Sequence, residues 1–123
     1  MKKQEKSSAD IVQRTSDYAL RIIKLYRYIQ KDDVGRVIGK QLLRSGTSVG
    51  ANVHEAQGAQ SRADFIAKIS IAHKEILETA YWLHLLTEAN IVPSDRMADL
   101  QNETQQIRKI LASILLTTKQ NCP

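Results

Sequence analysis

The chain has 123 residues, 42% of them hydrophobic and 25% charged, with a net charge of +5, which predicts one globular domain large enough to bury a core. Five glycines and two prolines argue against turn-rich β folds, and 5% aromatic residues are too few for the usual base-stacking platform. No apolar run reaches the roughly 18 residues of a membrane span, the charged N-terminus leads into no signal-peptide core, and the lone cysteine, Cys122, can make no internal disulfide, so we expect a cytoplasmic protein.

The first predicted helix spans about residues 9–31 and carries an excess of positive charge. Its apolar side chains recur in steps of three and four, which indicates one buried stripe: Val12, Thr15, Ala19, Ile22, Tyr26 and Ile29. Five basic residues fall on the opposite side of the helix: Arg14, Arg21, Lys24, Arg27 and Lys31. Residues 1–40 hold ten lysines and arginines against five acids, whereas the remaining chain is balanced. This asymmetry favours an anionic partner such as nucleic acid, and an ordinary solvated helix face is the alternative.

The second predicted helix spans about residues 34–57, with Asp33 as its candidate N-cap. Its buried stripe is expected to be Ile38, Leu42, Gly46 or Ser45, Val49, Val53 and Ala56. Small residues gather in the middle of this helix: Ser45, Gly46, Ser48, Gly50 and Ala51. Glycine costs about 1 kcal/mol relative to alanine inside a helix, so we expect something to approach this patch closely. Either a neighbouring helix or a bound ligand or partner fits that requirement.

The third predicted helix, about residues 61–89, begins with a capping box of Ser61 and Asp64 and ends before Pro93. Its stripe is Phe65, Ile69, Ala72, Ile76, Thr79, Leu83 and Leu86. The fourth predicted helix, about residues 94–119, has the most regular heptad pattern: Met97, Leu100, Thr104, Ile107, Leu111, Ile114 and Thr118. Because the connections are short, neighbouring helices must run antiparallel. The expected fold is an all-α, antiparallel up-down-up-down four-helix bundle that occupies residues 1–123 as one domain.

The residue types that support catalysis show no catalytic or metal-binding pattern. His54, His73 and His84 lack the i, i+4 spacing of a zinc site and the paired Glu-x-x-His motifs of di-iron bundles. The segment GRVIGK, residues 35–40, has one residue too few for a phosphate loop, and Gln41 follows where serine or threonine is needed. The serines are explained more simply as caps and packing residues than as nucleophiles. We therefore expect a non-enzymatic protein without a cofactor or metal.

Apolar side chains also lie beside the four stripes, in excess of what one bundle interior can hold: Leu25, Ile66, Ile71, Leu77, Trp82, Leu85 and Leu115. We expect some of them on an outer face of the bundle. A contiguous apolar face on a small protein is typical of an interaction surface. The pattern therefore favours a homo-oligomer.

The central segment, residues 41–75, reads QLLRSGTSVGANVHEAQGAQSRADFIAKISIAHKE and closely resembles a bacterial family of four-helix-bundle proteins named for 23S rRNA intervening sequences. The flanking segments YALRIIKLYRYI, residues 18–29, and ETAYWLHLL, residues 78–86, are similar to the same family, and the likeness covers roughly residues 10–118. The positions that match the recurring motif of this family are Arg44, Ser45, Gly46, Ser48, Gly50, Ala51, Asn52, Glu55, Ala56, Ser61, Asp64, Phe65 and Glu75. Most of these look like packing, capping and subunit-contact positions rather than an active site.

The resemblance implies a four-helix bundle assembled as a ring-like homopentamer, as in the related accessory proteins of diversity-generating retroelements. Those relatives engage nucleic acid and a reverse transcriptase through a basic surface, so Arg44 joins the basic residues of the first helix as a candidate nucleic-acid contact. The leading hypothesis is a non-enzymatic, oligomeric accessory protein that binds structured RNA or DNA. The alternative is a structural adaptor whose partner is another protein.

Overall fold

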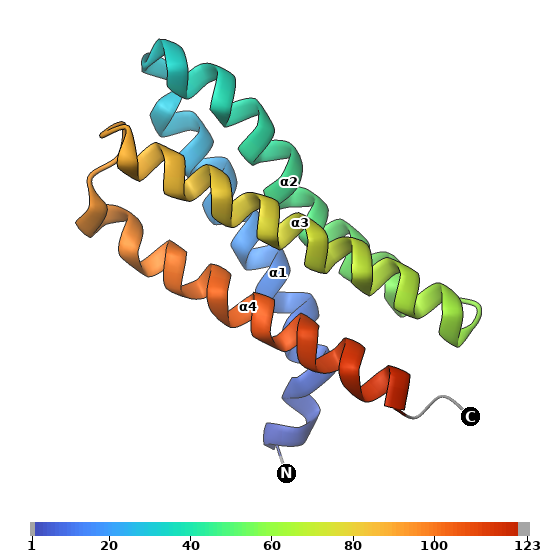
Figure 1. The fold of residues 1–123 in the computed structure, drawn as a ribbon. Coiled ribbons are helices and arrows are strands. Elements are labelled where there is room, and N and C mark those ends of the chain that lie inside the picture. The colour runs from blue at the N-terminus through green and yellow to red at the C-terminus, as the bar shows by residue number, and fades with distance from the viewer. Residues whose placement is uncertain (1, 121–123) are drawn as a thin grey trace.

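The computed structural model describes the backbone of residues 2–120 and the side chains of residues 11–120, and this part of the chain contains four α-helices and no strand (Figure 1). The elements are α1 (Lys2–Tyr28), a 3-10 turn η1 (Ile29–Lys31), α2 (Asp33–Gln57), α3 (Arg62–Glu88) and α4 (Ser94–Gln120). The predicted all-α bundle is confirmed. Cys122 lies outside the described residues. Within them, no helix is both long enough and apolar enough to cross a membrane.

Helices that follow one another in the chain pack side by side, and α1 and α4 close the bundle. The contact between α2 and α3 is the most extensive, and the two helices run alongside each other in Figure 1. The contact between α1 and α4 is the least extensive of the four. The side of the bundle where α1 meets α4 is therefore the most open one.

The N-cap of α2 is Asp32, and the prediction of Asp33 was wrong. The 3-10 turn ends at Lys31, and Asp32 then takes an extended backbone with φ −98° and ψ 133°. From there its carboxylate accepts a hydrogen bond of 2.8 Å from the Gly35 N–H. Asp33 already lies in the first turn of α2. Two consecutive aspartates fit the sequence pattern equally well, and the length of the preceding turn decides between them.

The helix α3 begins and ends close to the predicted positions. Ser61 Oγ accepts a hydrogen bond of 3.0 Å from the Asp64 N–H, while the Asp64 carboxylate accepts from the Gln60 N–H, one residue before the expected partner. At the other end, Asn90 has a φ of 61°. The N–H groups of Asn90 and Ile91 donate to carbonyls in the last turn of α3, which is a Schellman cap. Asparagine tolerates this left-handed backbone, so the helix stops before Pro93.

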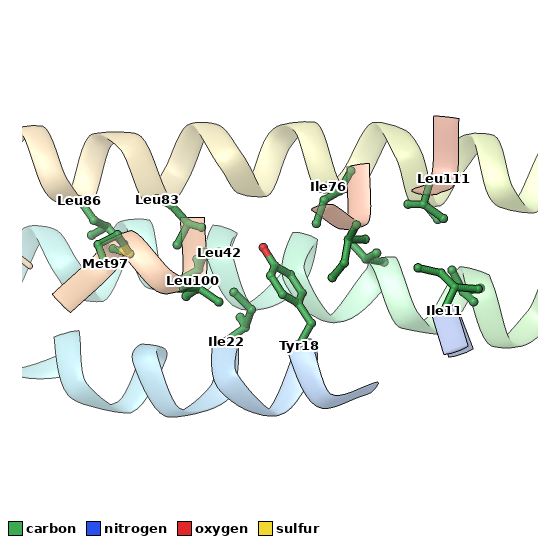
Figure 2. Packing of buried hydrophobic residues seen from close by; sticks show 14 of the residues in the cluster. Ile11, Tyr18, Ile22, Leu42, Ile76, Leu83, Leu86, Met97, Leu100 and Leu111 are labelled. Atoms are coloured by element: carbon green, nitrogen blue, oxygen red, sulfur yellow. The ribbon is translucent and has the colours of Figure 1, made fainter. Parts of the chain in front are cut away.

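The predicted stripes of α2, α3 and α4 form most of the core. Their fully buried hydrophobic members are Leu42, Val49, Val53, Ala56, Ile69, Ala72, Ile76, Leu83, Leu86, Met97, Leu100, Ile107 and Leu111. Figure 2 shows several of these side chains pointing between the helices. Four predicted core members nearer the helix ends are only half-buried: Ile38, Phe65, Ile114 and Thr118.

The predicted stripe of α1 was partly wrong. Three of its members are buried: Thr15, Ile22 and Ile29. Val12, Ala19 and Tyr26 are only half-buried, whereas Ile11 and Tyr18, each one residue earlier, are fully buried. The interior of the bundle therefore meets α1 on a side slightly rotated from the predicted one.

A buried polar pair explains the orientation of α1. Tyr18 is 1% exposed, and its hydroxyl, which points into the bundle in Figure 2, lies 2.6 Å from Thr104 Oγ1 of α4. Thr104 Oγ1 is in turn 2.8 Å from the Leu100 carbonyl, so the threonine can donate there and accept from the tyrosine. Burial raises the pKa of the Tyr18 hydroxyl well above its usual range. The pair joins α1 to α4 without leaving a buried polar atom unsatisfied.

The two glycines of the small-residue patch of α2 lie against α1. A Cβ added to Gly46 would lie 2.8 Å from the Ile22 side chain, and one added to Gly50 would lie 3.1 Å from the Thr15 carbonyl oxygen. The contact at Gly46 is closer than a Cβ atom can normally come, and the one at Gly50 is tighter than most Cβ contacts. The close helix crossing is therefore the correct explanation of these two glycines, whereas Ala51, on another side of α2, is exposed.

Candidate nucleic-acid interface

The five basic candidates of α1 and η1 do not form one uniform surface, because the first two make ion pairs with α4. Arg14 Nε and Nη2 donate to the two carboxylate oxygens of Glu103 at 3.0 and 2.7 Å. Arg21 Nη2 donates to Asp99 Oδ2 at 2.8 Å. These ion pairs tie α1 to α4 and neutralise part of the charge that the sequence predicted to face solvent.

The other three basic residues, Lys24, Arg27 and Lys31, are exposed as predicted. Lys31 Nζ lies 4.5 Å from the ring centroid of Tyr28, and the guanidinium of Arg96 lies 5.2 Å from the same centroid. Both distances are typical of cation–π contacts. The end of α1 and the start of α4 therefore hold their cations around one aromatic ring.

Arg96 was not among the residues singled out from the sequence, although a signal existed. In an antiparallel up-down bundle, the end of the first helix lies beside the start of the fourth. A basic residue in the first turns of α4 must therefore lie close to the basic end of α1. Charge counted along the chain does not reveal this, because Arg96 has Asp95 and Asp99 near it in the sequence.

A groove of about 310 Å³ lies between α1 and α4. Three basic residues line it, namely Arg21 and Lys24 from α1 and Arg96 from α4. The groove runs along the side of the bundle where the helices have the fewest contacts with each other. The basic residues thus surround a recess rather than a flat helix face.

Arg44, the sixth basic candidate, is bound by carboxylates of α3. Its Nη1 lies 3.2 Å from Glu75 Oε1, and its Nη2 is paired with Glu78, whose carboxylate also accepts a hydrogen bond of 3.0 Å from Trp82 Nε1. The hydrogen bond from Arg44 holds the pKa of the Glu78 carboxyl below its usual range. Glu75 is 8% exposed as a residue, so Arg44 compensates a carboxylate that is largely removed from water.

The remaining motif positions also have structural partners. The hydroxyls of Ser45 and Thr79 lie 2.8 Å apart in the α2–α3 contact. Ser48 Oγ donates to the Arg44 carbonyl at 2.6 Å, and the Asn52 amide donates to the Ser48 carbonyl. On the outer surface, Glu55 Oε1 lies 3.0 Å from Lys68 Nζ. Ala56 is buried, and Phe65 packs against the core. These motif positions therefore make packing and hydrogen-bonding contacts within the bundle.

Of the three histidines, His54 lies on α2, whereas His73 and His84 lie on α3. His54 Nε2 lies 3.0 Å from Ser16 Oγ, and His84 is exposed. Burial, and secondarily the charge of Arg108, lowers the pKa of His73 from its ordinary value. Among residues 11–120, no three His, Cys, Asp or Glu side chains form a group that could hold a metal ion.

Fold and surface together define a small antiparallel helical bundle with a basic recess between its first and last helices. The sequence profile of the 23S rRNA-intervening sequence protein family matches residues 7–113, and the chain belongs to this family. The resemblance carried by residues 41–75 is thereby confirmed, while the relation to accessory proteins of diversity-generating retroelements stays a prediction.

One solved structure shows the same fold. It is the crystal structure of a protein with unknown function from the S23 ribosomal protein family of Bacteroides thetaiotaomicron. The two chains have 41% sequence identity and superpose with a TM-score of 0.85, and the similarity covers 89% of this chain and 97% of that one. A comparison with curated proteins gave no match.

Proposed function

We propose that the protein is a non-enzymatic, oligomeric accessory protein that binds structured RNA or DNA through the basic end of the bundle. The observation that carries this proposal is that Lys24 and Arg27 of α1, Lys31 of η1 and Arg96 of α4 lie at the same end of the bundle. Cations in such an arrangement can neutralise phosphates and release counterions from nucleic acid. The family description, which names an intervening sequence of 23S rRNA, is consistent with an RNA partner.

The contacts divide the six basic candidates into three groups. Arg14 donates to both carboxylate oxygens of Glu103, Arg44 donates to the carboxylates of Glu75 and Glu78, and we assign both arginines structural roles. Lys24, Arg27 and Lys31 are exposed and are the principal candidate contacts. Arg21 is intermediate, since its partner Asp99 has an 88% exposed side chain and an exposed ion pair of this kind is weak.

Charge reversal tests the proposal. The variant Lys24→Glu/Arg27→Glu/Lys31→Glu should fold normally, because the three side chains are exposed, and should lose roughly tenfold or more in affinity for a labelled RNA or DNA hairpin. Arg21 is left unchanged, because a glutamate there would face Asp99. Fluorescence anisotropy measures the binding, and circular dichroism checks the helix content.

A control variant with the same net charge separates a local surface from a general charge effect. Lys74→Glu/Lys109→Glu/Lys119→Glu reverses three exposed residues of α3 and α4 and should bind nearly as tightly as the unmodified protein. Equal losses of hairpin affinity in both variants would show that only the net charge of the protein matters. If the unmodified protein does not bind the hairpin, the proposal is wrong.

The second candidate function is a protein adaptor, and exposed apolar side chains favour it. Val37 is 69% exposed, Leu20 64% and Leu116 61%. These residues lie on three different helices, so more than one outer face offers an apolar contact. Apolar surface of this kind is used in contacts between proteins, including contacts between copies of one chain. The adaptor becomes the leading candidate if hairpin binding is absent.

A further inference from the structure

The groove between α1 and α4 combines a basic rim with an apolar floor. Arg21, Lys24 and Arg96 supply the charge. The floor consists of Leu25, Tyr28, Val92, Met97 and Leu100. A surface that bound only phosphates would gain nothing from such a floor, since a phosphate prefers charged and hydrogen-bonding groups. The groove therefore suits a ligand that has an anionic part attached to an apolar part.

The cations of the rim are available to a ligand. Arg96 rests over Tyr28, which limits the freedom of its side chain before any ligand arrives. Arg21 gives one hydrogen bond to Asp99, and the 88% exposure of that carboxylate makes it easy for a phosphate to replace. Lys24 is exposed at the rim. A guanidinium plane can also stack on a nucleobase.

We propose that this groove binds one unpaired nucleotide of a single-stranded segment, with its phosphate among Arg21, Lys24 and Arg96 and its base against the apolar floor. The inference rests on the proposed nucleic-acid function and narrows it to a class of substrate. The volume of about 310 Å³ lies at the lower end of ligand sites. In a duplex the faces of the bases are stacked on one another and cannot lie against an apolar floor, whereas unpaired bases can be splayed out into a pocket.

The test compares a short single strand with a perfect duplex of the same sequence. The unmodified protein should prefer the single strand by roughly fivefold or more, which is the range expected for one accommodated base. Leu25→Trp fills the floor without changing charge and should abolish this preference while leaving duplex affinity unchanged. Leu20→Trp places the same side chain at an exposed position of α1 outside the groove and should keep the preference.

A second variant is needed because Leu25 also packs against the core. Arg96→Gln removes an exposed rim cation and should weaken binding of the single strand more than binding of the duplex. Its control, Lys109→Gln, removes an exposed cation that does not line the groove and should affect both equally. A nucleoside monophosphate should also displace the single strand at lower concentration than inorganic phosphate does.

The possible failures are distinguishable. Equal binding of single strand and duplex, unchanged in Leu25→Trp and Arg96→Gln, would overturn the nucleotide site while the general nucleic-acid function remained. Equal competition by inorganic phosphate and the nucleoside monophosphate would also overturn it, because the floor would then contribute nothing. If the unmodified protein binds neither the single strand nor the duplex, both proposals are wrong.

Discussion

At Gly46 the chains of α1 and α2 come so close that the Ile22 side chain fills the space a side chain would need. We expect Gly46→Leu to lower the free energy of unfolding by roughly 1–3 kcal/mol, because overpacking shifts the helices apart. Urea unfolding followed by circular dichroism measures the change. Ala51→Leu, at an exposed position of the same helix, should be nearly neutral. Equal stability of the two variants would mean that the crossing is looser than described.

The buried hydroxyl of Tyr18 gives stability a dependence on alkaline pH. Tyr18→Phe removes one hydrogen bond but leaves Thr104 bonded to the Leu100 carbonyl, so the cost near neutral pH should be about 1 kcal/mol. Burial raises the folded-state pKa of Tyr18 above its ordinary value of 10.0, so the unfolded chain loses this proton first. The contribution is therefore complete below pH 10.0 and is lost as the pH rises above it.

Unfolding curves at about pH 8 and about pH 11 test this expectation. The stability difference between the unmodified protein and Tyr18→Phe should shrink, or change sign, at the higher pH. Every other ionisable side chain is present in both proteins, so the difference isolates Tyr18. A constant difference would show that the hydroxyl is not buried in the folded state.

At the scale of the helix, the sequence predicted three stripes well and one less well, for a physical reason. In α4, polar residues fill most positions between the members of the stripe, so periodicity alone defines the buried side. In α1, apolar residues occur as adjacent pairs, such as Ile11 with Val12 and Tyr18 with Ala19. Either member of each pair continues a helical stripe. The bond from Tyr18 to Thr104 selects one of them, and no local pattern contains that information.

The beginning of α2 provides a test at the same scale. Asp32→Ala removes the acceptor for the Gly35 N–H and should cost about 1 kcal/mol of stability. Asp33→Ala removes a charge near the positive end of the helix and an exposed hydrogen bond of 2.9 Å from the Val34 N–H, and we expect this loss to be the smaller one because Asp33 is exposed. Thermal unfolding of the two variants ranks these effects. A larger loss of stability in Asp33→Ala than in Asp32→Ala would instead support Asp33 as the N-cap, as the sequence predicted.

The sequence predicted the candidate surface only in part, because ion pairs between helices are invisible along the chain. Arg14 and Glu103 are 89 positions apart, and Arg44 and Glu75 are 31 positions apart. A helical wheel places each arginine on the polar side and cannot show that a carboxylate of another helix faces it. The exposure of Lys24, Arg27 and Lys31 was predictable, because it follows from the helical pattern alone and depends on no contact with another helix.

For the whole molecule, the exposed apolar residues on several helices favour assembly. Each chain has a mass of 13.9 kDa. Light scattering at micromolar concentration should therefore give a multiple of this mass, and the family resemblance suggests five copies. Assembly would repeat the basic end of the bundle and strengthen binding through several weak contacts. A mass of 13.9 kDa that persists at high protein concentration would contradict this prediction.

The salt dependence of hairpin binding tests the proposed function most directly. Each phosphate that the protein neutralises contributes a slope of about −0.9 to the logarithm of affinity against the logarithm of salt concentration for duplex DNA, and about −0.7 for single strands. We expect a steep slope for the unmodified protein and a much shallower one for Lys24→Glu/Arg27→Glu/Lys31→Glu. Affinity that does not change with salt, or a slope that survives the charge reversal, would show that this basic surface does not bind the phosphates.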